Sequence, residues 1–175
     1  RTEKGALTGR ELGLYDPAYE HLDSEERHAA AQRECIFHKD DGIAGHGSDI
    51  LSGRHQGVRI VSEELEYSDS VDDSLTMDSN GFKGRHTETS FAVCSEITVE
   101  ASDGRKYSGY WWDSSPFSNG LVREECSKTA LERALSGIGP KRHRSGRFHM
   151  VVDRTVSSRL VSPLFSALNS ASIQQ

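Results

Sequence analysis

The chain has 175 residues and carries 27 Asp and Glu against 21 Lys and Arg, a net charge of −6. This length can build one hydrophobic core, or one core with a small appendage. The acidic balance argues against a nucleic-acid partner, because neutralising phosphates requires an excess of Lys and Arg. No apolar run approaches the ~20 residues of a membrane span, so we expect no membrane partner either.

Three cysteines, Cys35, Cys94 and Cys126, lie far apart and form no Cys-x-x-Cys pair. This spacing favours free thiols in a reducing cytoplasm over a disulfide framework. The apolar fraction is 34% and the mean hydropathy −0.62, low values for a compact enzyme. Together with an abrupt start at Arg1, these values lead us to expect a piece of a longer protein.

The first strong element is a helix. Residues 1–20 hold scattered charges and glycines and are expected to form a linker or arm. Asp23 lies three residues before Glu26, which is the spacing of a capping carboxylate at the start of a helix. Apolar residues then recur at helical spacing to about Lys39. We expect this helix to dock by its alanine-rich side.

A strand is expected at residues 57–61, where apolar residues alternate. Residues 63–78 then hold seven acidic side chains and no basic one. Clustered like charge is more typical of a solvated edge or loop than of a cation site.

A β-meander is the central prediction. Asn80-Gly81 and Asp103-Gly104 suit two-residue hairpin turns, and β-branched or aromatic residues flank both. Ile97 and Val99 alternate with polar residues, which predicts one apolar and one solvated face.

The last third of the chain is expected to fold as a helix, a strand and a second helix. Asp113-Ser-Ser-Pro116 should end the sheet, and Ser118 or Asn119 should cap a helix reaching Ile138, ended by the glycines at 137 and 139. A basic cluster at 141–144 is read as solvated, residues 147–152 as a strand, and residues from 155 as a helix kinked or split by Pro163. The predicted class is therefore α+β (mixed α/β), an antiparallel β-meander with flanking helices. Its parts are an arm (1–20), a helix plus meander (21–113), and a helix-strand-helix segment of the same domain (114–175).

The residues themselves assign no catalytic, metal-binding or substrate-binding role. The segment densest in potential ligands has no metal-site spacing and is read as a loop; it contains His38, Asp40, Asp41, His46 and Asp49. The glycines at 42, 45 and 47 lack the Lys-Ser/Thr pair of a phosphate loop, and no Gly-x-Ser-x-Gly elbow is present.

His86 is interpreted as a strand residue rather than a base. Of Trp111 and Trp112, one is expected to enter the core rather than stack on a nucleic-acid base.

Five stretches taken together resemble the TldD/PmbA family, also called modulator of DNA gyrase, and the PmbA (TldE) branch in particular. They are residues 75–91 (LTMDSNGFKGRHTETSF), 107–113 (YSGYWWD), 126–135 (CSKTALERAL), 145–153 (SGRFHMVVD) and 160–175 (LVSPLFSALNSASIQQ). The resemblance runs in order over about residues 12–175, and by the family layout it covers the middle of the protein.

The resemblance implies part of a bacterial, cytoplasmic zinc-dependent peptidase system, a hydrolase that processes or degrades unfolded peptides. In such a system a TldD-like subunit carries the zinc on a His-Glu-x-x-x-His helix, and the TldE-like partner lacks it. That motif is absent from these residues, so no catalytic or metal-binding residue carries over and no cofactor is expected in this segment. The implied partners are a TldD-like subunit or a second copy, and a peptide substrate.

Two other interpretations remain open. One is a non-catalytic interaction module, in line with the gyrase-modulator name, and the other is a structural fragment with no activity of its own. Under the peptidase interpretation, the meander could offer a strand edge to an extended peptide through backbone hydrogen bonds.

Overall fold

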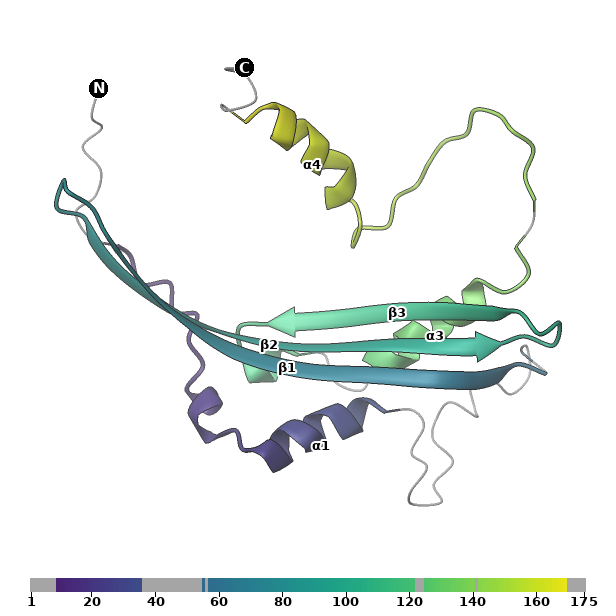
Figure 1. Ribbon diagram of the computed structural model, residues 1–175, viewed down its shortest axis with the longest axis horizontal. Helices are drawn as coiled ribbons and strands as arrows, with labels where there is room; N and C mark the ends of the chain where they lie inside the picture. The colour runs from purple at the N-terminus through teal and green to yellow at the C-terminus, as the bar shows by residue number, and fades with distance from the viewer. Residues whose placement is uncertain (1–8, 36–54, 56, 122–124, 141, 170–175) are drawn as a thin grey trace. The chain divides into compact units, whose positions relative to one another are not determined.

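A computed structural model describes residues 9–35, 55, 57–121, 125–140 and 142–169. The chain divides into two compact units, Arg1–Pro140 and Lys141–Gln175. The first unit contains the sheet and the helices that pack on it (Figure 1).

The first unit is built on a three-stranded antiparallel sheet in the order β1-β2-β3. Its strands are β1 (Arg59–Met77), β2 (Lys83–Glu100) and β3 (Lys106–Ser115). The predicted α+β class and antiparallel meander are confirmed. β3 runs to Ser115, so the sheet ends within the predicted segment Asp113–Pro116, at the residue before the proline.

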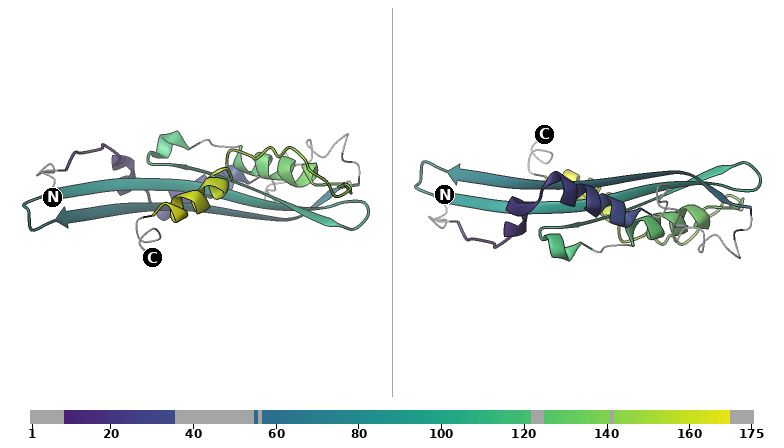
Figure 2. Two further views of the ribbon diagram at one scale, coloured as in Figure 1. Left: turned by 90° about the horizontal axis from the view of Figure 1, so that it is seen from above. Right: turned by 90° about the horizontal axis from the view of Figure 1, so that it is seen from below.

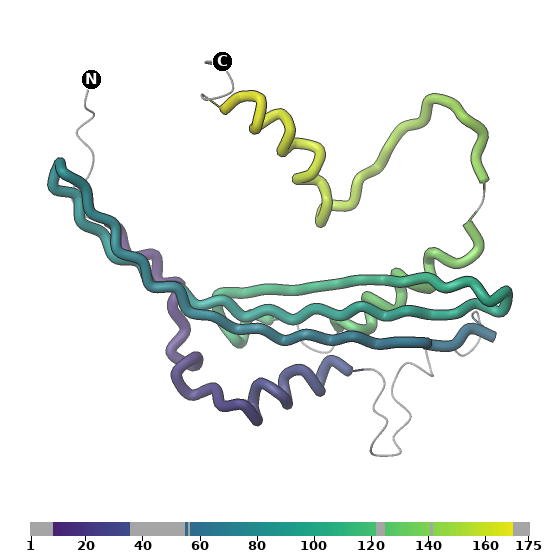
Figure 3. Tube along the Cα trace, viewed as in Figure 1, coloured from purple at the N-terminus to yellow at the C-terminus, as the bar shows by residue number. Residues whose placement is uncertain are grey.

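Two of the strands are much longer than the third. β1 and β2 stay paired as far as Met77 and Lys83, whereas the last partner of β3 on β2 is Phe91. Beyond Phe91 the two long strands continue as a two-stranded ribbon, which Figure 3 traces past the end of β3. The acidic segment 63–78 lies largely in β1, an edge strand among the described residues, as the predicted solvated edge or loop allows.

Both hairpin turns place a glycine in the left-handed region. Gly81 has φ of 95° and Gly104 has φ of 77°, where residues with a side chain are disfavoured. Asp78 N–H donates to the Phe82 carbonyl at 3.1 Å, which leaves residues 79–81 in the first loop. In the second turn the Ala101 N–H donates to the Arg105 carbonyl in the same way, which leaves residues 102–104 in the loop. Each loop is thus one residue longer than predicted, with the glycine in its last position.

The core lies between one face of the sheet and α3 (Cys126–Ser136). Ile97 and Val99 are fully buried there, and the helix buries a stripe at three- and four-residue spacing that consists of Ala130, Leu131, Ala134 and Leu135. Gly109 of β3 lies directly under the helix. A Cβ at this position would lie 2.0 Å from the carbonyl oxygen of Ala130. The missing side chain is what allows α3 to approach the sheet.

The start of α3 differs from the prediction. Residues Ser118–Gly120 form a short 3-10 turn, η2, and the α-helix begins only at Cys126. Ser118 lies in this turn and does not cap α3, whose N-cap position is Glu125; its N–H donates to Asp16 Oδ2 at 2.8 Å. The N–H of Cys126 is accepted by Glu34, which lies on the other helix of this unit.

That other helix, α1 (Ser24–Glu34), begins where the sequence predicts. Asp23 is its N-cap and accepts from the Glu26 N–H at 2.8 Å. The helix ends at Glu34, earlier than the expected Lys39, and residues 36–39 lie outside the described part of the chain. In Figure 2 the ribbon of β1 and β2 and the two helices are seen from above and below.

An N-terminal arm takes the place of β3 beside the ribbon. Thr89 N–H donates to the Leu14 carbonyl at 3.1 Å, and Thr89 Oγ1 accepts from the Asp16 N–H at 2.8 Å. Asp16 also caps the short helix η1 (Pro17–His21) by accepting from Ala18. Its bonds with Ser118 and Ala18 hold the pKa of the Asp16 carboxyl below its usual value. The arm is thereby fixed to β2 and to the turn after β3.

The second unit is described over residues 142–169 and contains α4 (Ser158–Ala167). The strand predicted at 147–152 is wrong: these residues make no ladder within the described part of the chain, and Val151 is 97% exposed. Asp153 Oδ1 accepts from the Thr155 N–H in a turn, and the helix starts after it. Pro163 lies inside α4 without splitting it.

Candidate functional site

The chemistry considered from the sequence falls mostly outside the described residues. His38, Asp40, Asp41, His46 and Asp49, and the glycines among them, are not described. Within the ranges that are described, no three His, Cys, Asp or Glu side chains are grouped to hold a metal ion. The described residues thus offer no ligand set that fits the zinc implied by the family resemblance.

His86 lies in β2, on the ribbon, as expected for a strand residue. Its Nε2 lies 3.1 Å from the Glu88 carboxylate. This pairing gives the imidazole a local structural partner.

The two tryptophans point to opposite faces of β3, as the alternation of a strand requires. Trp111 packs against the core, and the Arg133 guanidinium lies 4.3 Å from the centre of its ring. Trp112 is 49% exposed on the other face. The expectation that one tryptophan enters the core is thus met by Trp111.

Tyr110 shares the open face of the sheet with Trp112. It lines a shallow hollow with five other residues, Glu64, Leu65, Glu66, Cys94 and Glu96. Partial burial, and then a hydrogen bond with Cys94, raise the pKa of the Tyr110 hydroxyl, so that it stays a neutral donor. This face is apolar at Tyr110 and Trp112 and negative around them.

The outer edge of β1 is the second feature suited to binding. Among the described residues β1 pairs with β2 alone, so one side of its backbone makes no ladder there. A strand edge presents N–H and C=O groups that can pair with another extended chain. The strand is strongly acidic, with Glu63, Glu64, Glu66, Asp69, Asp72 and Asp73 along it.

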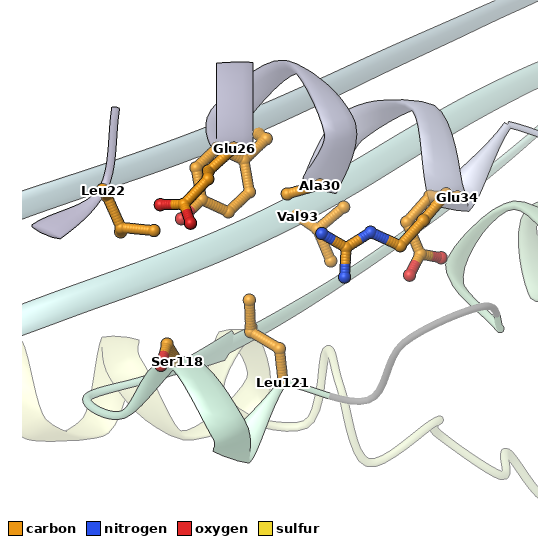
Figure 4. Close-up of a pocket in the computed structure, with 9 residues that line it drawn as sticks. Leu22, Glu26, Ala30, Glu34, Val93, Ser118 and Leu121 are labelled. Carbon is orange, nitrogen blue, oxygen red and sulfur yellow. The ribbon is translucent and has the colours of Figure 1, made fainter. Parts of the chain in front are cut away.

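A cavity of about 230 Å³ lies beneath α1 (Figure 4). Val93 and Tyr67 of the sheet form its floor, Leu22 and Leu121 contribute apolar walls, and Leu121 points toward the helix in Figure 4. The helix contributes Glu26, Ala30, Arg33 and Glu34 over three successive turns, and Ser118 completes the lining.

Polar contacts hold α1 over this cavity. Arg27 makes a bidentate pair with Asp69 of β1, at 2.7 and 3.0 Å, and the Asp69 side chain is only 6% exposed. At the other end, Glu34 Oε2 accepts from the Cys126 N–H at 3.2 Å. The helix is therefore attached near both ends, and between them it presents the small side chain of Ala30 to the cavity.

The contact between Glu34 and α3 also affects Cys126. Burial, and then the negative charge of Glu34, raise the pKa of the Cys126 thiol to about 12. The thiol stays protonated at neutral pH and acts as a packing residue.

Sequence reasoning missed this cavity. Its one local signal is the small residue Ala30 between Glu26 and Arg33 on a single helix face. The walls come from segments far apart in the chain, so their convergence depends on the tertiary fold.

Comparison with known proteins identifies the family. The family model described as PmbA/TldA metallopeptidase central domain matches residues 29–138. A crystal structure of a candidate modulator of DNA gyrase from Bacteroides thetaiotaomicron is similar, with a TM-score of 0.76 and 31% sequence identity over 99% of this chain. A comparison with curated proteins found no match.

The sheet with its packed helices is thus the central domain found in this class of metallopeptidase-like proteins. The chain belongs to the PmbA/TldD family. It spans 36% of the length of the Bacteroides protein. No helix among the described residues is long and apolar enough to cross a membrane.

Proposed function

We propose that this chain is part of a TldE/PmbA-type subunit of a cytoplasmic zinc-dependent peptidase system that acts on unfolded peptides. The zinc site would lie outside this segment, on a TldD-like partner subunit. The observation that carries the proposal is the match of residues 29–138 to the central domain of PmbA/TldA metallopeptidases.

In this proposal the sheet serves as a scaffold for an extended peptide. The outer edge of β1 supplies backbone donors and acceptors, which recognise a peptide without reading its side chains. Such recognition suits a peptidase of loose specificity. The acidic side chains of β1 further favour a basic peptide, because opposite charges speed encounter and fix the orientation of binding.

Reconstitution tests the proposal. The full-length protein containing this chain is mixed with a TldD-like subunit, and hydrolysis of an unfolded substrate, reduced and alkylated casein, is measured. We expect the mixture to hydrolyse casein, each subunit alone to be inactive, and a zinc chelator to abolish the activity. Activity of the TldD-like subunit that is unchanged by this protein, together with no association between them, would contradict the proposal.

A non-catalytic interaction module is the second candidate function. It is favoured by the description of the similar Bacteroides structure as a candidate modulator of DNA gyrase. A pull-down of gyrase subunits by the full-length protein separates the two: gyrase binding without peptidase reconstitution supports the interaction module.

A further inference from the structure

The cavity beneath α1 is held open by the contacts at the two ends of the helix. The bidentate pair of Arg27 with the buried Asp69 fixes the first turn to β1. Glu34, itself 5% exposed, fixes the last turn to the start of α3. A buried carboxylate that loses its partner is costly, so the helix cannot settle onto the sheet by breaking either contact.

The volume of the cavity limits what it can bind to a small chemical group. At about 230 Å³ it lies below the ~300–1,000 Å³ of pockets that enclose a drug-sized molecule. It can admit a single large side chain. Ala30 sets this volume, because a longer side chain at the centre of the helix face would occupy the space.

The lining selects an apolar group with polar ends. Val93, Tyr67, Leu22 and Leu121 give most of the interior its apolar surface, beside Ser118 and the buried Glu34, whose carboxylate accepts from the Cys126 N–H. Glu26 and Arg33 are exposed and carry opposite charges. A seven-residue separation along a helix puts these two charges ~10 Å apart, one on each side of Ala30. Backbone amide groups on either side of an inserted side chain would find an acceptor at Glu26 and a donor at Arg33.

We propose that this cavity binds one leucine- to phenylalanine-sized side chain of an unfolded peptide. The inference rests on the proposed function, because it assigns the cavity to the same peptide substrate. It adds a preference for an apolar residue to backbone recognition at the β1 edge.

Amide NMR spectra of the full chain test the inference, with N-acetyl-leucinamide and N-acetyl-phenylalaninamide as probes. We expect saturable shifts in the low-millimolar range at the amides of α1 and at Val93. N-acetyl-glycinamide should give no saturable shifts, because it has no side chain to bury. N-acetyl-lysinamide tests whether the buried Glu34 attracts a cation, and tighter binding of the lysine probe would overturn the apolar assignment.

Ala30→Leu fills the cavity and should weaken binding of the leucine probe by about tenfold or more, the equivalent of losing one buried branched side chain. Gln32→Leu adds the same side chain at an exposed position of α1 and should leave binding unchanged. Equal binding by wild type and Ala30→Leu, or no saturable shift with either apolar probe, would overturn the inference. The wild-type titration decides the matter even if Ala30→Leu fails to fold.

The two proposals fail separately. Absent probe binding combined with casein hydrolysis by the reconstituted pair would remove only the cavity assignment. Probe binding without reconstitution would leave a side-chain pocket in a protein that is not part of a peptidase.

Discussion

Gly109 determines how closely α3 approaches the sheet. Its absent Cβ would lie 2.0 Å from the Ala130 carbonyl oxygen and 2.4 Å from the Ala134 nitrogen, both backbone atoms that cannot rotate away. The core of Ile97, Val99 and Leu131 depends on this approach.

Gly109→Ala should therefore destabilise the chain by about 3 kcal/mol, the upper end of the range for overpacking a core. Gly104→Ala is the matched control. It meets nothing within 4 Å but keeps a φ of 77°, so its cost should be only ~1 kcal/mol from the left-handed backbone. Urea unfolding of both variants measures the difference, and equal losses would show that α3 can move away from β3 cheaply.

The ion pair between Asp73 and Arg85 crosses the ribbon at 2.6 Å. Hydrogen bonds from Arg85 and Thr87 lower the pKa of the Asp73 carboxyl from 3.8 to about 2. A lowered pKa in the folded state stabilises the protein above the unfolded value, and this stability is lost as the pH falls toward 2.

Asp73→Asn should lower Tm slightly at pH 7, because both side chains are well exposed and water screens the pair. The difference from wild type should stay constant from pH 8 to about 5 and shrink between about 4 and 2. Thermal unfolding across this range checks the prediction. A difference that persists at pH 2, or that high salt does not reduce, would show that the carboxylate is not responsible.

At the scale of elements, α1 is attached to the sheet by polar contacts rather than by a buried apolar stripe. Glu34 is its only buried residue, and the Arg27–Asp69 pair fixes its first turns. Helices in proteins usually owe their stability to an apolar face, so this helix should depend strongly on that pair.

Arg27→Met should increase amide hydrogen exchange throughout α1 while β2 and α3 remain protected, because it leaves the buried Asp69 without its partner. Adding Asp69→Leu should restore part of the protection by removing the unpaired charge. Gln32→Met, at an exposed position of the same helix, is the control. Unchanged exchange in the Arg27 variant would mean that other contacts hold the helix.

The elements themselves were largely predictable from local signals. Asp23 gave the start of α1, the glycines at 81 and 104 gave the two turns, and the alternation of Ile97 and Val99 gave the buried face. These features depend on capping, backbone freedom and strand alternation, which operate within a few residues.

The errors occurred where distant residues decide the outcome. Ser118 does not cap α3 because the α-helix begins only at Cys126, while a contact with Asp16, 102 residues earlier, holds Ser118 in the turn η2. The apolar run 147–152 forms no strand, because strand formation requires a neighbour with which to pair. The cavity beneath α1 was missed for the same reason, since its floor belongs to β1 and β2 and its walls to segments on either side of the sheet in the sequence.

At the scale of the whole molecule, all the buried hydrophobic residues that are described belong to the first unit, from Phe91 to Leu135. In the second unit Phe148, Val151, Phe165 and Leu168 are each at least 68% exposed. No hydrophobic side chain in the described part of residues 142–169 is buried.

A chain that ends at Pro140 should therefore fold by itself and unfold cooperatively, with a Tm within about 2 °C of the 175-residue chain, because core burial sets the unfolding enthalpy. Calorimetry of the two chains gives the comparison. A non-cooperative transition in the shorter chain would show that residues 141–175 are needed for the fold.

Peptide recognition in the proposed function depends on the outer edge of β1. Hydrogen exchange of the full-length protein, with and without an unfolded basic peptide, tests this most directly. We expect slower exchange of the backbone amides of β1 between residues 59 and 77, and a weaker effect from an acidic peptide of equal length. Exchange in β1 that is the same with and without saturating basic peptide would contradict peptide binding at this edge.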